Sequence, residues 1–236
     1  MLWYLRSPQS IVRLKFRGAV PRLELFADIL KVGVPGLVNT AITNLSVVLL
    51  TGIAGQFGPE AAIGYAMGAR LEYIMQPVAF GFGTAIVAMV GTNWGAGQHR
   101  RARRIAWAGA ITIAAVCGTI GAVVALWPSL WMGLFSDDPE VARLGALYLR
   151  IVGPAYVCFG LALGLFFVSQ GFGRGFGAMS ANAARLLVSA GAGLATVYWL
   201  DLGIAGFFTA IATGFVLYAA LLAYIVLRVR APERPA

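Results

Sequence analysis

Residues 81–104, GFGTAIVAMVGTNWGAGQHRRARR, change character within a few positions. The stretch begins as an apolar run with several glycines, becomes polar at Thr92 and Asn93, and ends in a cluster of arginines: Arg100, Arg101, Arg103 and Arg104. An apolar helix followed directly by arginines is typical of a transmembrane helix that leaves the bilayer on its cytoplasmic side. The stretch therefore predicts a membrane protein and gives its orientation.

The composition of the whole chain supports the same prediction. Hydrophobic residues make up 60% of the 236 residues, charged residues only 11%, and the mean hydropathy is +0.82. Soluble domains carry about 25% charged residues. The net charge of +9 is spread in short clusters between apolar runs, which is the pattern of membrane topology and not of a nucleic-acid-binding surface. We expect an integral membrane protein with no nucleic-acid partner.

The apolar runs define the expected fold. A helix needs about 20 apolar residues to cross a bilayer, and we expect six such helices, at approximately residues 32–57, 62–94, 102–131, 144–170, 178–200 and 203–227. The prediction is an all-α bundle, a six-helix transmembrane lobe over residues 32–228. Residues 1–31 are predicted to be a basic cytoplasmic linker and residues 229–236 a cytoplasmic tail. A chain that opens on a linker suggests a part of a longer protein.

The distribution of charges predicts the orientation of this lobe. Of the 18 basic residues, only Arg70, Arg143 and Arg150 fall in segments assigned to the outside. The others, Arg185 included, are assigned to the cytoplasmic side. The positive-inside rule then places both termini in the cytoplasm, in a multi-pass protein of the plasma membrane.

Several residues carry local structural predictions. Pro35, Pro77 and Gly81 are expected to kink or loosen their helices, because proline removes a backbone hydrogen bond. Ser136 or Asp137 is expected to cap the fourth helix. Small residues at helical spacing predict close helix contacts in lipid, at three places: Gly91 with Gly95, Gly160 with Gly164, and Gly191 with Gly193.

The sequence gives little support to an enzyme. Its one histidine, His99, lies in the arginine loop, and no acidic residue is assigned to the bilayer centre. Intramembrane hydrolysis or a proton relay needs ionisable groups at depth. Cys117 and Cys158 each lie in an apolar run and are expected to be packing residues. We expect no catalytic site, metal site or cofactor.

Neutral polar residues are concentrated in the first helix. Asn39 and Thr43 are four residues apart and share a helix face, as do Thr40 and Asn44. They could line a substrate cavity, or they could form hydrogen bonds between helices, each worth about 1 kcal/mol in lipid. Both interpretations stay open.

Glu72 and Gln76 are likewise four residues apart, in the second helix. The first interpretation places Glu72 at the level of the outer headgroups, near Arg70. The second makes it a cation-attracting group at the mouth of a cavity. With Asn39, Thr43 and Asn44, these two residues complete the set of cavity candidates.

Several motifs together resemble one known family. Arg70-Leu71-Glu72, Pro77 and GTNWGAGQHRRARR resemble the second helix and following loop in one half of the multidrug and toxic compound extrusion (MATE) transporters. LFSDDPEVARLGALYLRI, GFGRG and KVGVPGLVNTAITN, which contains Pro35, resemble other parts of the same half. The resemblance covers residues 28–228 and indicates the C-terminal six-helix half.

The resemblance implies a function. MATE transporters have two six-helix lobes and export organic compounds, often cationic, in exchange for Na⁺ or H⁺, with rocking of the lobes about a shared site. The partner of this lobe would be an N-terminal lobe, missing or separately encoded, or a second copy of the chain. Some family members carry acids in the first and fourth helices of this half, where this sequence has none. The site of any coupling ion is therefore expected outside this chain.

Two alternatives to an efflux antiporter remain at this point. A flippase for lipid-linked or polysaccharide precursors would favour a cationic cavity, whereas the cations here are assigned to cytoplasmic loops. A truncated membrane protein without transport activity is the other alternative.

Overall fold

The computed structural model describes residues 23–200 and 202–229. These residues form helices and contain no strand, so the predicted all-α class is confirmed. Most of the predicted linker and nearly all of the predicted tail lie outside the described residues. The helices are α2 (Leu23–Ala54), η1 (Gly55–Phe57), α3 (Pro59–Gly95), α4 (His99–Leu126), α5 (Ser129–Met132), α6 (Pro139–Val152), η2 (Gly153–Ala155), α7 (Tyr156–Gly171), α8 (Gly175–Tyr198) and α9 (Gly203–Leu227).

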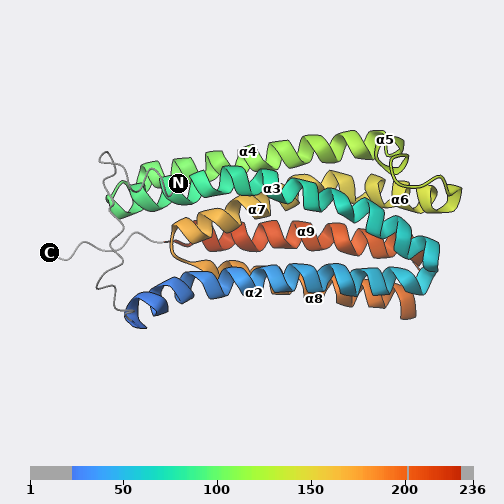
Figure 1. Cartoon of the computed structure of the whole chain (residues 1–236), viewed down its shortest axis with the longest axis horizontal. Helices are drawn as coiled ribbons and strands as arrows, with labels where there is room; N and C mark the ends of the chain where they lie inside the picture. Colours follow the sequence, from blue (N-terminus) through green and yellow to red (C-terminus); the bar gives the residue numbers. More distant parts are fainter. Residues whose placement is uncertain (1–22, 201, 230–236) are drawn as a thin grey trace, which may run out of the picture.

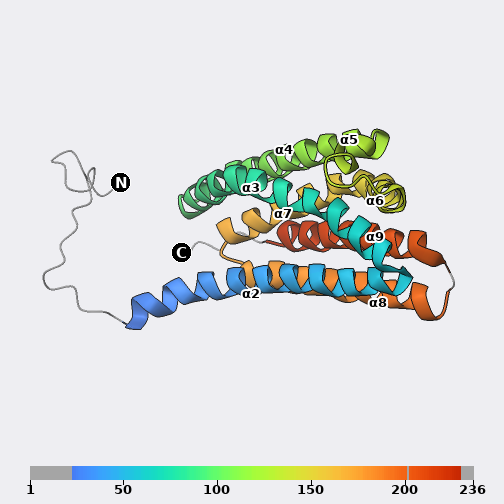
Figure 2. The ribbon, with the colours of Figure 1, turned by 45° about the vertical axis from the view of Figure 1, so that its right-hand side comes forward.

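The long helices lie side by side along one axis, and their connections alternate between the two ends of the bundle (Figure 1). The α3–α4 and α7–α8 connections lie at one end, and η1, α5 and the α8–α9 connection lie at the other. Helix α2 packs on α8, α8 on α9, and α7 on both α4 and α9 (Figure 2). Helices α2 and α3 make few contacts with each other beyond their shared turn.

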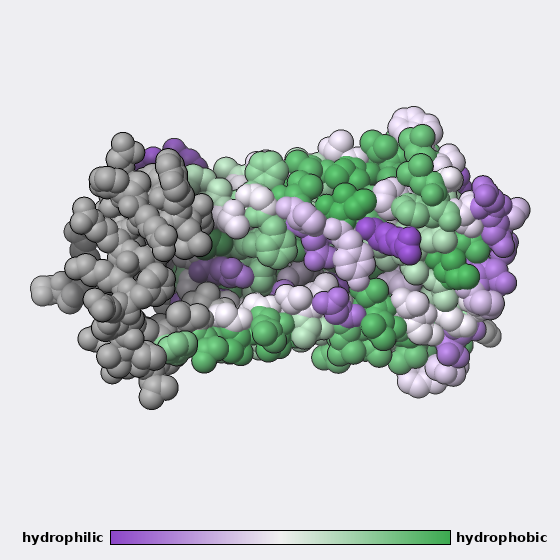
Figure 3. Space-filling model, in the orientation of Figure 1, coloured by the Kyte–Doolittle hydropathy of each residue, from purple (hydrophilic) through white to green (hydrophobic). Residues whose placement is uncertain are grey.

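Five described helical segments are long and apolar enough to cross a membrane, with α6, η2 and α7 counted as one. Helix α8 is the remaining long helix, with 24 residues, and it is less apolar because it carries Asn182 and Arg185. Large hydrophobic residues cover much of the outside of the bundle (Figure 3). The chain is a multi-pass membrane protein.

Charged residues gather near the two ends of the bundle, apart from Glu72 and Arg185, which line a cavity within it. Arg100, Arg101, Arg103 and Arg104 occupy the first turns of α4, and Arg103 Nη2 donates a 2.6 Å hydrogen bond to the carbonyl oxygen of Val229 after α9. Four acids, Glu60, Asp137, Asp138 and Glu140, lie at the opposite end, at the start of α3 and around the start of α6. The bundle thus has one arginine-rich end, and which side of the membrane that end faces stays a prediction.

Helices α2 and α4 begin or end at residues other than the predicted ones. Helix α2 begins at Leu23 and not near residue 32, so part of the predicted linker is helical. The third predicted helix, 102–131, ends at Leu126, because Pro128 cannot donate a backbone hydrogen bond; a separate short helix, α5, follows.

Helices α2 and α3 continue without interruption through Pro35, Pro77 and Gly81, the three residues predicted to kink or loosen them.

The fourth predicted helix, 144–170, is interrupted in its middle. Residues Gly153–Ala155 form a 3₁₀ turn, η2, between α6 and α7. Pro154 accounts for the break because it lacks the amide hydrogen that an α-helix needs at that position. At this turn the backbone of Gly153 lies against Gly121 of α4, where a side chain on Gly121 would collide with it.

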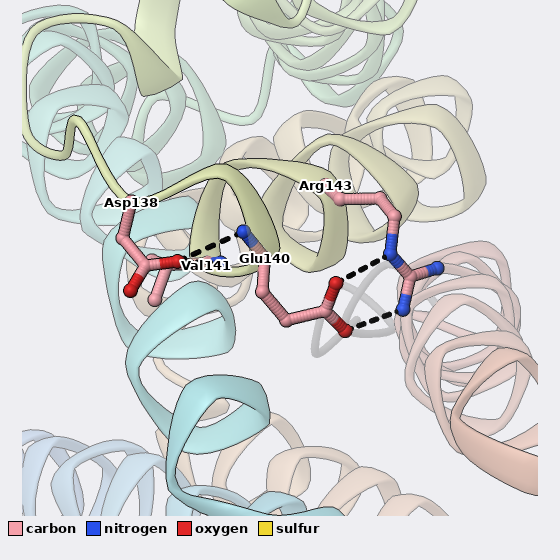
Figure 4. A network of polar contacts seen from close by, with 4 residues as sticks. All are labelled: Asp138, Glu140, Val141 and Arg143. Atoms are coloured by element: carbon pink, nitrogen blue, oxygen red, sulfur yellow. Dashed lines mark hydrogen bonds and ion pairs between the residues drawn. The ribbon is translucent and has the colours of Figure 1, made fainter.

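Helix α6 is capped by Asp138, so the prediction of Ser136 or Asp137 as the cap was wrong. Asp138 Oδ1 accepts hydrogen bonds from the backbone amides of Glu140 (2.8 Å) and Val141 (3.2 Å) (Figure 4). Ser136 instead accepts a bond from the amide of Asp138. The cap is Asp138 because Pro139 occupies the first helical position, which proline favours.

Replacing Asp138 with alanine is expected to lower the free energy of unfolding by about 1 kcal/mol, because two amides at the start of α6 lose their acceptor. Denaturant titration of the purified protein in detergent measures this change. Asp137→Ala is the matched control, since Asp137 is exposed and caps no helix. Equal effects of the two substitutions would contradict the assignment of the cap.

Helices α4 and α7 approach each other closely through glycines of α7. A Cβ atom added at Gly160 would lie 2.6 Å from Cys117 Cβ, and one added at Gly164 would lie 2.6 Å from Ala110 Cα. The predicted close contact through this glycine pair is confirmed. In the other two pairs only one glycine makes a contact. A Cβ added at Gly193 would lie 2.9 Å from the Phe207 ring and one at Gly91 3.5 Å from the Gly171 carbonyl oxygen, whereas Gly95 and Gly191 have nothing within 4 Å.

Candidate functional site

A cavity of about 340 Å³ lies between α2 on one side and α3 and α7 on the other, with residues of α8 and α9 behind it. All five predicted cavity candidates line it: Asn39, Thr43, Asn44, Glu72 and Gln76. Figure 3 shows polar residues in a band between the hydrophobic surfaces of the upper and lower helices. A volume of this order suits a small organic molecule. Whether these residues bind a substrate stays a prediction.

Hydrogen bonds from Asn182 join α2 to α8 at the wall of this cavity. Asn182 Nδ2 donates to Asn39 Oδ1 (2.9 Å) and to Thr43 Oγ1 (3.0 Å). Thr40 and Asn44 bond only to carbonyl oxygens of their own helix and are exposed. The two interpretations of the polar residues of α2 are thus compatible: Asn39 and Thr43 connect two helices, and all four line the cavity.

Arg185 lies inside the bundle, so its assignment to the cytoplasmic side was wrong. Its side chain is only 5% exposed. Arg185 Nε donates to Asn182 Oδ1 (2.9 Å), and Nη2 donates to Ser46 Oγ (3.1 Å). The guanidinium also lies over two aromatic rings of α9, 5.6 Å from the centroid of Phe215 and 5.9 Å from that of Tyr218. These polar and cation–π contacts replace water around the charge.

Glu72 lines the cavity and does not accompany Arg70. Its Oε1 accepts a 2.8 Å hydrogen bond from the hydroxyl of Tyr148, which lies 3.4 Å from the hydroxyl of Tyr156. Arg70 is exposed and lies over the ring of Phe135. Glu72 therefore lies at a cavity and forms no ion pair with Arg70 among the described residues. Its depth in the membrane and its attraction for cations stay predictions.

The sequence prediction missed Asn182, Arg185 and Tyr148. A signal existed for Arg185, because it falls seven residues inside the apolar run 178–200 and an ionisable residue within such a run marks a functional position. Asn182 lies one helical turn earlier on the same face. Tyr148 gave no signal, because only the folded arrangement brings its hydroxyl to Glu72.

The described residues contain no group of three histidine, cysteine or acidic side chains that could hold a metal ion. His99 lies at the start of α4, with its ring 4.4 Å from that of Trp94 and outside the cavity. Cys117 is buried and Cys158 half-buried, and neither forms a disulfide. The cavity is therefore the strongest candidate site in the described part of the chain.

Comparison with known proteins adds a family match. The profile of the MatE family matches residues 35–199. The chain is 27% identical over 138 residues to the probable multidrug resistance protein NorM of Thermotoga maritima, covering 58% of this chain and 30% of that protein. It is 21% identical over 182 residues to the multidrug export protein MepA of Staphylococcus aureus, covering 74% of this chain and 39% of that protein.

Solved transporter structures have the same fold as this chain. An outward-facing multidrug resistance MATE family transporter of the MOP superfamily superposes with a TM-score of 0.86 at 18% identity, covering 96% of this chain and 51% of that one. A MOP superfamily transporter from Pyrococcus furiosus gives a TM-score of 0.85 at 18% identity, covering 93% of this chain and 50% of the other. The chain spans about half the length of these structures and a smaller share of the curated relatives.

Proposed function

Because the chain belongs to the MatE family of membrane transporters, we propose that it forms one lobe of a multidrug efflux transporter in the plasma membrane, with both termini in the cytoplasm. The single observation that carries this proposal is the cavity between α2, α3 and α7, which combines polar side chains with aromatic walls. Its substrates are small organic compounds, cationic ones among them. Glu72 supplies a carboxylate that attracts such cations.

The second lobe of the transporter is supplied by another six-helix unit. The chain matches about half of the solved transporters, and its cavity opens between α2 and α3, two helices with few mutual contacts. A separately encoded N-terminal lobe or a second copy of this chain would cover that opening. Exchange against Na⁺ or H⁺ and rocking of the two lobes about the cavity complete the proposed mechanism.

The named relatives favour efflux over the flippase alternative. The sequence argument against a flippase assigned the cations to cytoplasmic loops and none to the cavity, and the buried Arg185 removes that argument. The curated relatives, however, are multidrug resistance and export proteins.

Expression in an efflux-deficient bacterium tests the proposal. The chain, with a six-helix partner lobe or as a homodimer, is expected to lower the accumulation of a cationic fluorescent dye. Thr40→Trp is expected to abolish this export, because Thr40 lines the cavity and its hydroxyl bonds only within α2. Val48→Trp is the matched control on the same helix, at a position that is 67% exposed and does not line the cavity.

Two results would contradict the proposal. Dye accumulation that is unchanged both with and without a partner lobe would remove the transporter assignment. Equal export by Thr40→Trp and Val48→Trp would show that transport does not use this cavity.

A further inference from the structure

Glu72 and Arg185 face the same cavity from different helices but do not pair with each other. Both residues line the cavity, Glu72 from α3 and Arg185 from α8. Within the described part of the chain, the one ion pair is between Arg143 and Glu140, on the exposed start of α6. Two opposite charges therefore lie separated in an apolar bundle, where uncompensated charges are costly.

Each of these two side chains keeps one polar atom without a protein partner. Glu72 accepts its one described hydrogen bond at Oε1, which leaves Oε2 free. Arg185 donates through Nε and Nη2, which leaves Nη1 free. Among the described residues, the buried polar atoms that lack a partner are on His99 and Ser189 only, so neither free atom is sealed inside the protein. Both atoms are therefore available to a molecule in the cavity.

The bound atoms hold these two side chains in place. Asn182, Ser46 and the rings of Phe215 and Tyr218 fix the guanidinium of Arg185. Tyr148 fixes the carboxylate of Glu72. A charged group that is held before a ligand arrives loses little freedom on binding, so its remaining contacts can add affinity and specificity.

We propose that this cavity selects zwitterionic compounds, with the cationic group of the ligand at Glu72 and an anionic group, such as a carboxylate, at Arg185. The inference rests on the proposed function and narrows its substrate class from organic cations to molecules that carry both charges. Such a ligand compensates both buried charges at once, whereas a simple cation leaves Arg185 without a counter-charge. Aromatic residues of the cavity, Phe80, Phe159 and Phe167 among them, provide apolar contact for the body of the molecule.

Three related dyes test this selectivity on the unmodified chain. Rhodamine B is zwitterionic, its ethyl ester keeps only the positive charge, and fluorescein is an anion. Fluorescence polarisation with the purified chain in lipid nanodiscs, corrected with protein-free nanodiscs, gives the three dissociation constants. Rhodamine B is expected to bind about tenfold more tightly than its ester, because the carboxylate gains a charge-assisted contact with Arg185. Fluorescein is expected to bind more weakly than rhodamine B.

Substitutions test whether Arg185 binds the carboxylate of the dye and Glu72 its cationic group. Arg185→Gln is expected to remove the preference for rhodamine B while the ester still binds, which also shows that the variant is folded. Glu72→Gln is expected to weaken the binding of rhodamine B and of its ester, which both carry a positive charge, by about tenfold. Arg70→Gln and Glu140→Gln are the matched controls, because both residues are exposed and outside the cavity, and they are expected to leave all three dissociation constants unchanged.

The outcomes separate the inference from the proposed function. Equal or tighter binding of the ester by the unmodified chain would overturn the selectivity for zwitterions but leave an organic-cation transporter intact. A preference for rhodamine B that survives in Arg185→Gln would also overturn it. Binding of none of the three dyes would count against the cavity as a drug site and therefore against both. The dye comparison on the unmodified chain decides the inference even if a variant fails to fold.

Discussion

Replacing Gly164 with alanine is expected to lower the free energy of unfolding by about 1–3 kcal/mol. Alanine is the better helix former by about 1 kcal/mol, so an exposed glycine-to-alanine change would stabilise the protein. At Gly164 the added Cβ would lie 2.6 Å from Ala110 Cα and 3.2 Å from the Ala110 carbonyl oxygen. Backbone atoms cannot turn aside as a flexible side chain can. Helices α4 and α7 must therefore separate, and they lose contacts along their length.

The matched control for this prediction is Gly191→Ala in α8, where nothing lies within 4 Å of the added Cβ. That change is expected to leave stability unchanged or to raise it by up to about 1 kcal/mol. Titration with sodium dodecyl sulfate in mixed micelles measures both variants. Cys117, buried beside Gly160, reports opening of the α4–α7 contact by its reaction with a thiol dye in a Cys158→Ser background. Similar stability of the two variants would contradict close packing at Gly164.

The sequence predicted the existence and order of the long helices better than their ends. The apolar run of α9, 203–227, agrees with the structure at both ends. Hydropathy locates the part of a helix that can lie in lipid, and a helix continues beyond that part until a cap or a proline ends it. Helices α2 and α6 therefore start before their apolar runs, at Leu23 and Pro139. The break at Gly153–Ala155 lies inside an apolar run, where hydropathy gives no signal.

Only part of the candidate site could be predicted, because the sequence shows which residues share a helix face but not which helices pack together. Periodicity identified Asn39 and Thr43 as one polar face of a helix, and both line the cavity. Their partner Asn182 is 143 residues from Asn39 in the sequence, so only the packing of α2 on α8 reveals the bond. Arg185 was misassigned because the positive-inside rule counts every cation as a topology marker. That rule does not apply to an arginine that is held inside the bundle by hydrogen bonds and aromatic rings.

Asn182→Leu is expected to lower the free energy of unfolding by about 2–4 kcal/mol. The substitution removes the Asn182 side chain from three groups: Asn39 Oδ1, Arg185 Nε, and Thr43 Oγ1, which keeps its bond to the carbonyl oxygen of Asn39. The loss at Arg185 is the largest of the three, because an incompletely bonded charge remains buried. The same change frees the guanidinium to move, so the affinity of the cavity for rhodamine B is expected to fall as well.

Asn44→Leu is the control for this prediction, since Asn44 lines the same cavity but bonds only to the carbonyl oxygen of Thr40 in its own helix. It is expected to change stability by less than about 0.5 kcal/mol. A double-mutant cycle sharpens the test. The double variant Asn39→Leu/Asn182→Leu is expected to lose less free energy of unfolding than the sum of the two single losses. The reason is that Asn39→Leu removes the acceptor Oδ1, which Asn182→Leu alone leaves unpaired. Strict additivity, or equal losses for Asn182→Leu and Asn44→Leu, would show that these bonds do not hold α2 against α8. The polar face of α2 would then serve only the cavity.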